Sequence, residues 1–203
     1  MLSPTAEDIL AIFSRVFGGL KRPFTLHSRT LSGRIVYRRS CLACRSAASG
    51  RADCAHCRGG SYSALTADSV LNHINGGAAV GIYPADENGL CRFSVLELGG
   101  PAPAVALRSL RDACRSIGAS CLCEICGHGE SARLWLFFGR ELSPKASLYA
   151  AMKVISEAFS ENINGAGAIT DILPAAGNGF GRPAVLPLFD MSDNFSFLLN
   201  LSS

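Results

Sequence analysis

Four cysteines place the tightest constraint on how this chain can fold, because they are spaced as two Cys-x-x-Cys pairs. One such pair sets two thiolates on a tight turn, and two pairs supply all four ligands of a closed tetrahedral metal site. A closed site is structural, since no coordination position is left for a substrate. The alternatives are two disulfides or a cluster of small buried thiols. We expect a structural zinc knuckle formed by Cys41, Cys44, Cys54 and Cys57.

The N-terminus and the hydropathy of the chain bear on its location. Residues 1–20 lack the basic start, apolar stretch and small-residue cleavage site of a secretory signal. We therefore expect a reducing cytoplasm, where thiolates bind metal rather than form disulfides. No apolar run approaches the roughly 20 residues of a membrane-spanning helix, so we expect no membrane partner.

The segment around the four cysteines is strongly basic. Residues 21–58 contain nine Lys and Arg residues and one acidic residue, Asp53, which gives a local formal charge of +8 against +3 for the whole chain. Eight of the nine are arginines, whose planar guanidinium suits phosphate. A basic module of this kind predicts binding to DNA or RNA, and the alternative is a solvated basic face without a partner. The candidate contacts are Arg34, Arg38, Arg39, Arg45, Arg51 and Arg58.

The length of the chain limits its domain organisation. The 203 residues, 48% of them hydrophobic and 17% charged, are enough for one well-buried domain and a small appendage. We expect an N-terminal helix in residues 1–24, a basic strand segment with the zinc knuckle in residues 25–64, and the main core in residues 65–203.

Hydrophobic spacing predicts alternating helices and strands. Helices are predicted to begin at Thr5, at a Thr66 cap and at Ser143, and a further helix is predicted to end at a Gly118 cap. Strand-like runs predict short strands in residues 25–37, a hairpin of residues 78–83 with 90–98, a second hairpin of residues 120–125 with 132–138, and a last strand at residues 184–188. This order is typical of an α+β fold in which helices cover one face of a largely antiparallel sheet.

Several short segments together resemble a known family. The segments are LTADSVLNHI from Leu65, AAVGIYP from Ala78, SARLWLFF from Ser131, and DILP, GFG and VLPL between Asp171 and Leu188. In this order they resemble the archaeo-eukaryotic primase domain of TOTE conflict systems and related mobile elements. The resemblance implies a primase-like core, an antiparallel or mixed sheet covered by helices, with one RRM-like half. It also implies that such domains are often joined to helicase and nuclease domains, and we expect any such activity here to come from a separately encoded helicase or nuclease.

The same resemblance implies template-directed nucleotidyl transfer. Such primases hold two divalent cations, Mg²⁺ or Mn²⁺, with an Asp-x-Asp pair on a strand, and a histidine in a Ser-x-His element grips the incoming nucleotide. In this chain Glu97 and Gly99 fall at the two acid positions, and Ser131, Ala132 and Arg133 form the Ser-x-His element. Glycine offers no ligand, and one carboxylate does not readily chelate two cations.

These departures predict a catalytically degenerate domain that still binds nucleic acid or nucleotide. Ser131 and Arg133 are the candidate phosphate contacts, with a surface arginine as the alternative reading of Arg133. Glu97 is either a residual metal ligand or a carboxylate paired with an arginine. Two alternatives stay open. One is an active primase-polymerase that takes its ligands from Glu97 with Asp171 or Asp190, and the other is a protein-interaction scaffold.

A second group of cysteines lies further along the chain. Cys121 and Cys123 share a face if their segment is a strand, whereas Cys126 does not, and Cys114 lies on the preceding predicted helix. We interpret these residues as small buried side chains rather than as a ligand set.

Overall fold

The structure is a computed structural model. It describes residues 5–17, 24–29, 35–39, 65–86, 88–160, 163–175, 182–188 and 196–198. Some of the predicted site residues lie outside these ranges, namely Arg34, Cys41, Cys44, Arg45, Arg51, Cys54, Cys57, Arg58 and Asp190. The zinc knuckle therefore stays a prediction. None of the helices in the described part is long and apolar enough to cross a membrane.

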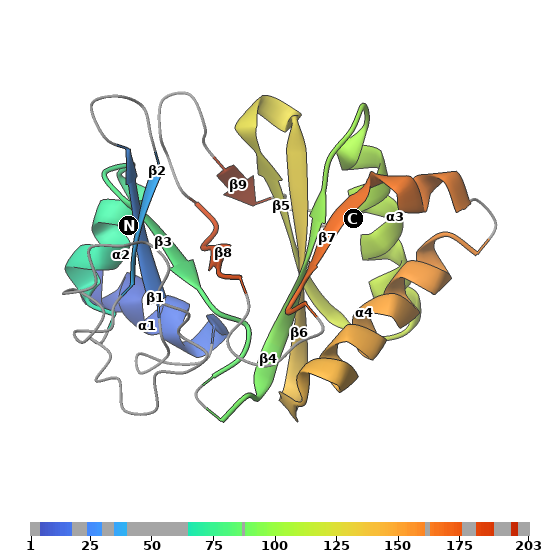
Figure 1. Cartoon of the computed structure of the whole chain (residues 1–203), viewed down its shortest axis with the longest axis horizontal. Helices are drawn as coiled ribbons and strands as arrows, with labels where there is room; N and C mark the ends of the chain where they lie inside the picture. The colour runs from blue at the N-terminus through green and yellow to red at the C-terminus, as the bar shows by residue number, and fades with distance from the viewer. Residues whose placement is uncertain are drawn as a thin grey trace.

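A four-stranded antiparallel sheet forms one side of the molecule (Figure 1). Its strands lie in the order β2-β1-β3-β8, so residues of the predicted basic segment pair with β3 of the predicted main core. The predicted domain boundary between residues 64 and 65 is therefore crossed by this sheet. Two helices accompany it. The elements are α1 (Ala6–Phe17), β1 (Phe24–Arg29), β2 (Ile35–Arg39), α2 (Ala67–Ile74), β3 (Ala79–Ile82) and β8 (Ala184–Val185).

A five-stranded antiparallel sheet forms the other side. The chain runs β4-α3-β5-β6-α4-β7, and these strands lie in the order β7-β4-β6-β5, with β9 beyond β5. This is the split βαβ arrangement of ferredoxin-like and RRM-like sheets, so the predicted RRM-like half is confirmed. The elements are β4 (Cys91–Leu98), α3 (Pro103–Ser116), β5 (Ser120–Cys126), β6 (Ser131–Leu142), α4 (Pro144–Ala158), β7 (Ile169–Leu173) and β9 (Ser196–Leu198).

Two hydrophobic cores cover the two faces of the five-stranded sheet. On one face, aliphatic residues of β4, β5 and β6 pack against α3 and α4, with Leu134 and Leu107 fully buried. On the other face, Phe93 and Trp135 pack against Phe17 of α1 and against Val80 of the four-stranded sheet. Figure 1 shows the resulting layers, with α3 and α4 outside one sheet and α1 and α2 beside the other.

The predicted helix ends are confirmed where the structure describes them. Thr5 and Asp8 cap α1 reciprocally, because the Thr5 N–H donates to Asp8 Oδ2 and the Asp8 N–H donates to Thr5 Oγ1. The Thr66 hydroxyl accepts from the Ser69 N–H at the start of α2. Gly118 follows α3 with a φ of +69°, which is the left-handed conformation that glycine adopts without strain.

The strand predictions need three corrections. The hairpin of residues 78–83 with 90–98 is wrong, because β3 and β4 lie in different sheets and only an isolated bridge joins Ala85 to Cys91. Turn residues between two strands therefore did not identify the pairing partner. The strand that follows α4 is β7, which was not predicted, and the predicted strand at residues 184–188 is reduced to β8, which pairs with β3. The second hairpin, β5 with β6, is confirmed.

Candidate active site on the five-stranded sheet

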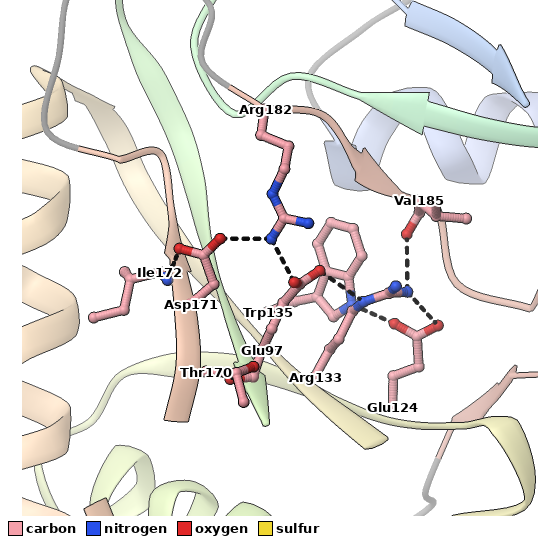
Figure 2. A network of polar contacts seen from close by, with 9 residues as sticks. All are labelled: Glu97, Glu124, Arg133, Trp135, Thr170, Asp171, Ile172, Arg182 and Val185. Atoms are coloured by element: carbon pink, nitrogen blue, oxygen red, sulfur yellow. Dashed lines mark hydrogen bonds and ion pairs between the residues drawn. The ribbon is translucent and has the colours of Figure 1, made fainter. Parts of the chain in front are cut away.

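A row of four charged residues crosses the five-stranded sheet. Glu97 of β4 is the register partner of Asp171 on β7 and of Arg133 on β6, and Arg133 is in turn the partner of Glu124 on β5. Directly opposite residues in a sheet point to the same face, so the four side chains lie side by side. Figure 2 shows this row, with Arg182 reaching it from outside the sheet.

The alternation of β4 explains why Glu97 lies on this face. Val95 and Phe93, two and four residues before Glu97, belong to the core between the two sheets, so the same face begins apolar and becomes charged near the end of the strand. The intervening residues Leu96 and Leu98 belong to the opposite core under α3 and α4. The strand β4 therefore contributes to the cores on both faces, and on the face toward the four-stranded sheet it also contributes to the charged row.

Glu124 is the deepest member of the row, with its residue fully buried. Its Oε2 accepts a hydrogen bond of 2.8 Å from Trp135 Nε1, and its Oε1 lies 3.4 Å from Arg133 Nη1. Arg133 Nε also lies 3.4 Å from Glu97 Oε1, and Nη1 donates to the backbone carbonyl of Val185 at 3.4 Å. A buried carboxylate needs such partners, because an unpaired buried charge is strongly destabilising.

Arg182 closes the other end of the row. Its Nη2 lies 2.5 Å from Glu97 Oε2 and 2.7 Å from Asp171 Oδ2, so one guanidinium joins the two carboxylates (Figure 2). Asp171 is further fixed because its Oδ1 accepts from the N–H of Ile172 at 2.7 Å. The Thr170 hydroxyl donates to the Glu97 carbonyl at 3.2 Å and ties β7 to β4.

The segment that carries Arg182 and β8 is anchored by His73 of α2. This buried imidazole accepts from the Val80 N–H at Nδ1, at 3.0 Å, and therefore donates from Nε2 to the Pro187 carbonyl, also at 3.0 Å. The Leu186 N–H donates to the Val80 carbonyl at 2.8 Å. These bonds hold residues 184–187 against β3, on the side from which Arg182 approaches the row.

The electrostatics keep both arginines charged. Burial by itself would lower the pKa of Arg133, but the negative charges of Glu124 and Glu97 raise it above its usual value. Burial would also lower the pKa of Arg182. Its hydrogen bond to Glu97, together with the negative charges of Glu97 and Asp171, nevertheless raises this pKa above its usual value. The two guanidinium groups thus neutralise most of the charge of the three carboxylates.

The structure brings together some of the predicted site residues. Glu97 and Arg133 are in contact, and Asp171, considered as an alternative ligand, lies next to Glu97. Ser131 starts β6 opposite Cys126, two positions before Arg133. Arg38 and Arg39 lie on β2, opposite Leu26 and Thr25.

Glu124 and Arg182 were missed by sequence reasoning. An acid within an apolar strand is a signal for a buried partner, and it was present at Glu124 within β5. Arg182 directly follows the GFG segment, residues 179–181, that carries part of the family resemblance. Its contact with Glu97 joins residues 85 positions apart, so the spacing of nearby residues could not reveal it.

The donor set does not fit the pair of divalent cations that the resemblance implies. Two carboxylates are adjacent, Glu97 and Asp171, and both already bind Arg182. Within the described ranges, no group of three or more His, Cys, Asp or Glu residues is arranged to hold a metal ion. Gly99 lies next to Thr170, with the position of a Cβ at Gly99 only 3.1 Å from Thr170 Cγ2, so a second acid there would be crowded.

Comparisons with known proteins agree with this fold. Residues 8–174 match the family described as the archaeo-eukaryotic primase domain of the TOTE conflict system. Among solved structures, the chain is similar to the polymerase domain of Ligase D from Mycobacterium tuberculosis in complex with DNA. The TM-score is 0.50 at 14% identity, and the match covers 90% of this chain and 75% of that chain. At this identity the likeness concerns the fold. The search of curated proteins gave no match.

Proposed function

Because the chain belongs to the archaeo-eukaryotic primase domain family of TOTE conflict systems, we propose that it is a primase-like domain that binds nucleic acid or nucleotides without polymerising them. One observation carries the proposal, namely the Arg182 guanidinium between Glu97 and Asp171. A cation that bridges two phosphate oxygens would need these same carboxylates. The protein supplies its own cation at the place where the chemistry would need a metal.

The pairing of Arg133 adds to this argument. The family's histidine position is occupied by an arginine whose Nε and Nη1 atoms face Glu97 and Glu124. The row and Arg182 together thus contain two permanent cations and three carboxylates, an arrangement that is nearly neutral without any metal. Nucleotidyl transfer depends on neutralising phosphate charge in the transition state, and carboxylates engaged by arginine do not hold the metals that do so.

Nucleic acid is the proposed partner. The similar Ligase D domain was solved in complex with DNA, and the basic segment of this chain, residues 21–58, has a formal charge of +8. We assign phosphate contacts to Arg38 and Arg39 on β2 and to the four further arginines named above, with the zinc knuckle as the scaffold of this segment. A nucleotide phosphate would be bound beside Ser131 and Arg133 at the start of β6.

A second candidate function rests on the adjacency of Glu97 and Asp171. Register partners on neighbouring strands place two carboxylates side by side, as an active nucleotidyltransferase would require. This candidate needs Arg182 to leave both carboxylates before a metal binds. Its distinguishing outcome is divalent-dependent incorporation that is lost in Glu97→Ala and Asp171→Ala.

The proposal is tested with two assays on the same purified chain. Labelled nucleotide incorporation is measured on primed and unprimed templates with Mg²⁺ or Mn²⁺, and binding of a labelled oligonucleotide is measured as a function of salt. We expect no incorporation, and binding that weakens steeply with salt because phosphate contacts release counterions. The double variant Arg38→Ala, Arg39→Ala should reduce the salt slope, whereas Arg92→Ala on β4 should not.

Three other results would overturn the proposal. Incorporation sensitive to Glu97→Ala establishes the second candidate. Absence of both incorporation and binding favours a protein-interaction scaffold. Binding that is insensitive to salt and to the Arg38 and Arg39 substitutions places the contact elsewhere. The knuckle is tested separately by metal analysis, with one zinc per chain expected and lost in Cys44→Ser, but retained in Cys91→Ser.

A further inference from the structure

Three thiols meet under the last turn of α3, on the face of the sheet opposite the charged row. The chain reverses at Gly118, and the Ala119 N–H donates to the Cys114 carbonyl at 2.8 Å, so β5 starts directly beside the helix end. Alternation along β5 turns Cys121 and Cys123 toward the helices. Cys114 and Cys123 belong to the aliphatic core there, and Cys121 packs at its margin.

The three side chains interact with one another. The Cys121 thiol is hydrogen-bonded to both Cys114 and Cys123. These bonds, with the nearby charges of Arg115 and Arg111, lower the pKa of Cys121, while the pKa values of Cys114 and Cys123 are raised. A single negative charge in this cluster is therefore best held by Cys121. Of the cysteines that the structure describes, Cys121 is also the one that is not buried.

We propose that Cys121 is a peroxide-reactive thiol that forms a reversible disulfide with Cys114. Exposure decides which sulfur reacts first, because a peroxide reaches the part-exposed Cys121 and not the fully buried Cys114. The site is a redox modification site, on the face of the sheet away from the charged row. It does not depend on the proposed nucleic-acid function.

Geometry selects Cys114 over Cys123 as the second sulfur. Residues i and i+2 of a strand are about 6.6 Å apart with parallel side chains, which is near the upper limit of Cα separations in disulfides. Cys123 would thus require distortion of β5, which is paired with β6 along its length. Cys114 approaches Cys121 from the facing helix, and its thiol is already within hydrogen-bonding range.

The chemistry balances in two steps. The Cys121 thiolate attacks one oxygen of hydrogen peroxide, the O–O bond breaks, and hydroxide leaves and takes up a proton, which gives a sulfenic acid and water. The Cys114 sulfur then attacks the Cys121 sulfur, the S–O bond breaks, and the hydroxyl leaves with the Cys114 proton as a second water. Two thiols are oxidised to a disulfide and one peroxide is reduced to two waters.

Trypsin offers a direct readout on the wild-type chain. Cleavage after Arg111, Arg115 and Arg133 separates Cys114, in residues 112–115, from Cys121, Cys123 and Cys126, in residues 116–133, and fragmentation of the joined peptides identifies the linked cysteine. The protein is treated with hydrogen peroxide, alkylated under denaturing conditions, digested and analysed by mass spectrometry. We expect residues 112–115 to be joined to residues 116–133 through Cys121, and the link to vanish after reduction with dithiothreitol.

Three variants assign the roles. Cys121→Ser should abolish the link and leave Cys114 alkylated, and Cys114→Ser should leave a sulfenic acid on Cys121 that dimedone traps. Cys91→Ser, at a buried thiol on β4, should leave the link unchanged. A link through Cys123, an internal Cys121–Cys123 bond, or unlinked and unmodified peptides from the peroxide-treated wild type would each overturn the proposal. The wild-type result stands even if a variant fails to fold.

Discussion

The two faces of the five-stranded sheet differ in what holds them together. The face under α3 and α4 is a closed aliphatic core whose central residues are fully buried, such as Leu134 and Leu107. The face toward the four-stranded sheet begins with Phe93 and Trp135 and ends in the row of Asp171, Glu97, Arg133 and Glu124. Neighbouring residues of one strand thus point to two faces, one stabilised mainly by apolar packing and the other also carrying the charged row.

Successive side chains of a strand point to opposite faces of the sheet. One set of residues can therefore stabilise the helix-covered core while the residues between them form the charged row. The helix-covered face is stabilised by the removal of apolar side chains from water and by their close packing. Neither contribution requires directional contacts. The opposite face depends on oriented partners, since each charge is stable only while its counter-charge stays in place. Substitutions on the two faces should therefore fail in different ways.

The largest effect is expected at Glu124. Glu124→Leu leaves the Trp135 N–H without its acceptor and removes one of the two carboxylates beside Arg133, and this should lower the free energy of unfolding by about 3–5 kcal/mol. Glu124→Gln retains an acceptor for Trp135 and should lower it less. Urea unfolding of both variants measures the difference. If Glu124→Leu has the same free energy of unfolding as the wild type, the polar contacts of Glu124 stabilise the fold no more than an apolar side chain of similar size does.

A smaller loss is expected at Leu134, on the other face. Leu134→Ala leaves a cavity in a fully buried aliphatic site and should cost about 3 kcal/mol. Because Leu134 points away from the charged row and lies outside the basic segment of residues 21–58, oligonucleotide binding by the folded fraction should be unchanged. Unfolding curves and binding titrations on the same sample test this. Loss of oligonucleotide binding without loss of folded protein would contradict the claim that the helix-covered face affects stability alone.

Replacing Arg182 should change the free energy of unfolding only slightly, although Arg182 contacts both Glu97 and Asp171 of the charged row. Its side chain is 52% exposed, and Arg92, which pairs with Glu141 at 3.0 Å, is 52% exposed as well. Because solvent screens such pairs, Arg182→Ala and Arg92→Ala should each change the free energy of unfolding by less than about 1 kcal/mol. Thermal unfolding of the two variants compares them. A much larger loss in Arg182→Ala alone would make Arg182 a principal stabilising residue of that face.

The smallest effect is expected at the cap of α1, the helix that brings Phe13 and Phe17 to the aromatic core. Hydrogen bonds from the Thr5 backbone and side chain lower the pKa of Asp8 below 3.8. The cap therefore stabilises the fold above the ordinary carboxyl range, and this is lost as the pH falls through the lowered pKa. Asp8→Asn should lower the melting temperature slightly at neutral pH, and the difference should shrink in acid. A pH-independent difference would contradict the capping account.

The sequence predicted the parts of the fold that local physics decides. The Thr5 and Thr66 caps and the Gly118 turn depend on a few adjacent residues, and so does the β5–β6 hairpin with its short loop. The pairing of β3 with β1 and β8 could not be predicted this way, because it joins residues far apart in the sequence, such as Leu26 with Val80 and Gly81 with Val185. Local turn chemistry at residues 84–89 was compatible with either outcome.

The candidate site was predictable only in part for the same reason. Glu97 and Arg133 were identified by their departure from a family pattern, and their contact follows from strand register. The roles of Glu124 and Arg182 arise from contacts between distant segments, one through a cross-strand pair and one through the segment that precedes β8. Asp171 was weighed only as an alternative ligand, because β7 was not recognised as a strand.

The central claim is that arginine occupies the place of the metal, and Mn²⁺ binding measured by electron paramagnetic resonance tests it most directly. The zinc-saturated wild-type chain should leave added Mn²⁺ in solution, since Glu97 and Asp171 are engaged by Arg182. Arg182→Ala should take up Mn²⁺, and adding Asp171→Asn should abolish that uptake. Stoichiometric Mn²⁺ binding by the wild-type chain, lost in Glu97→Gln, would contradict the account and establish a metal-dependent site.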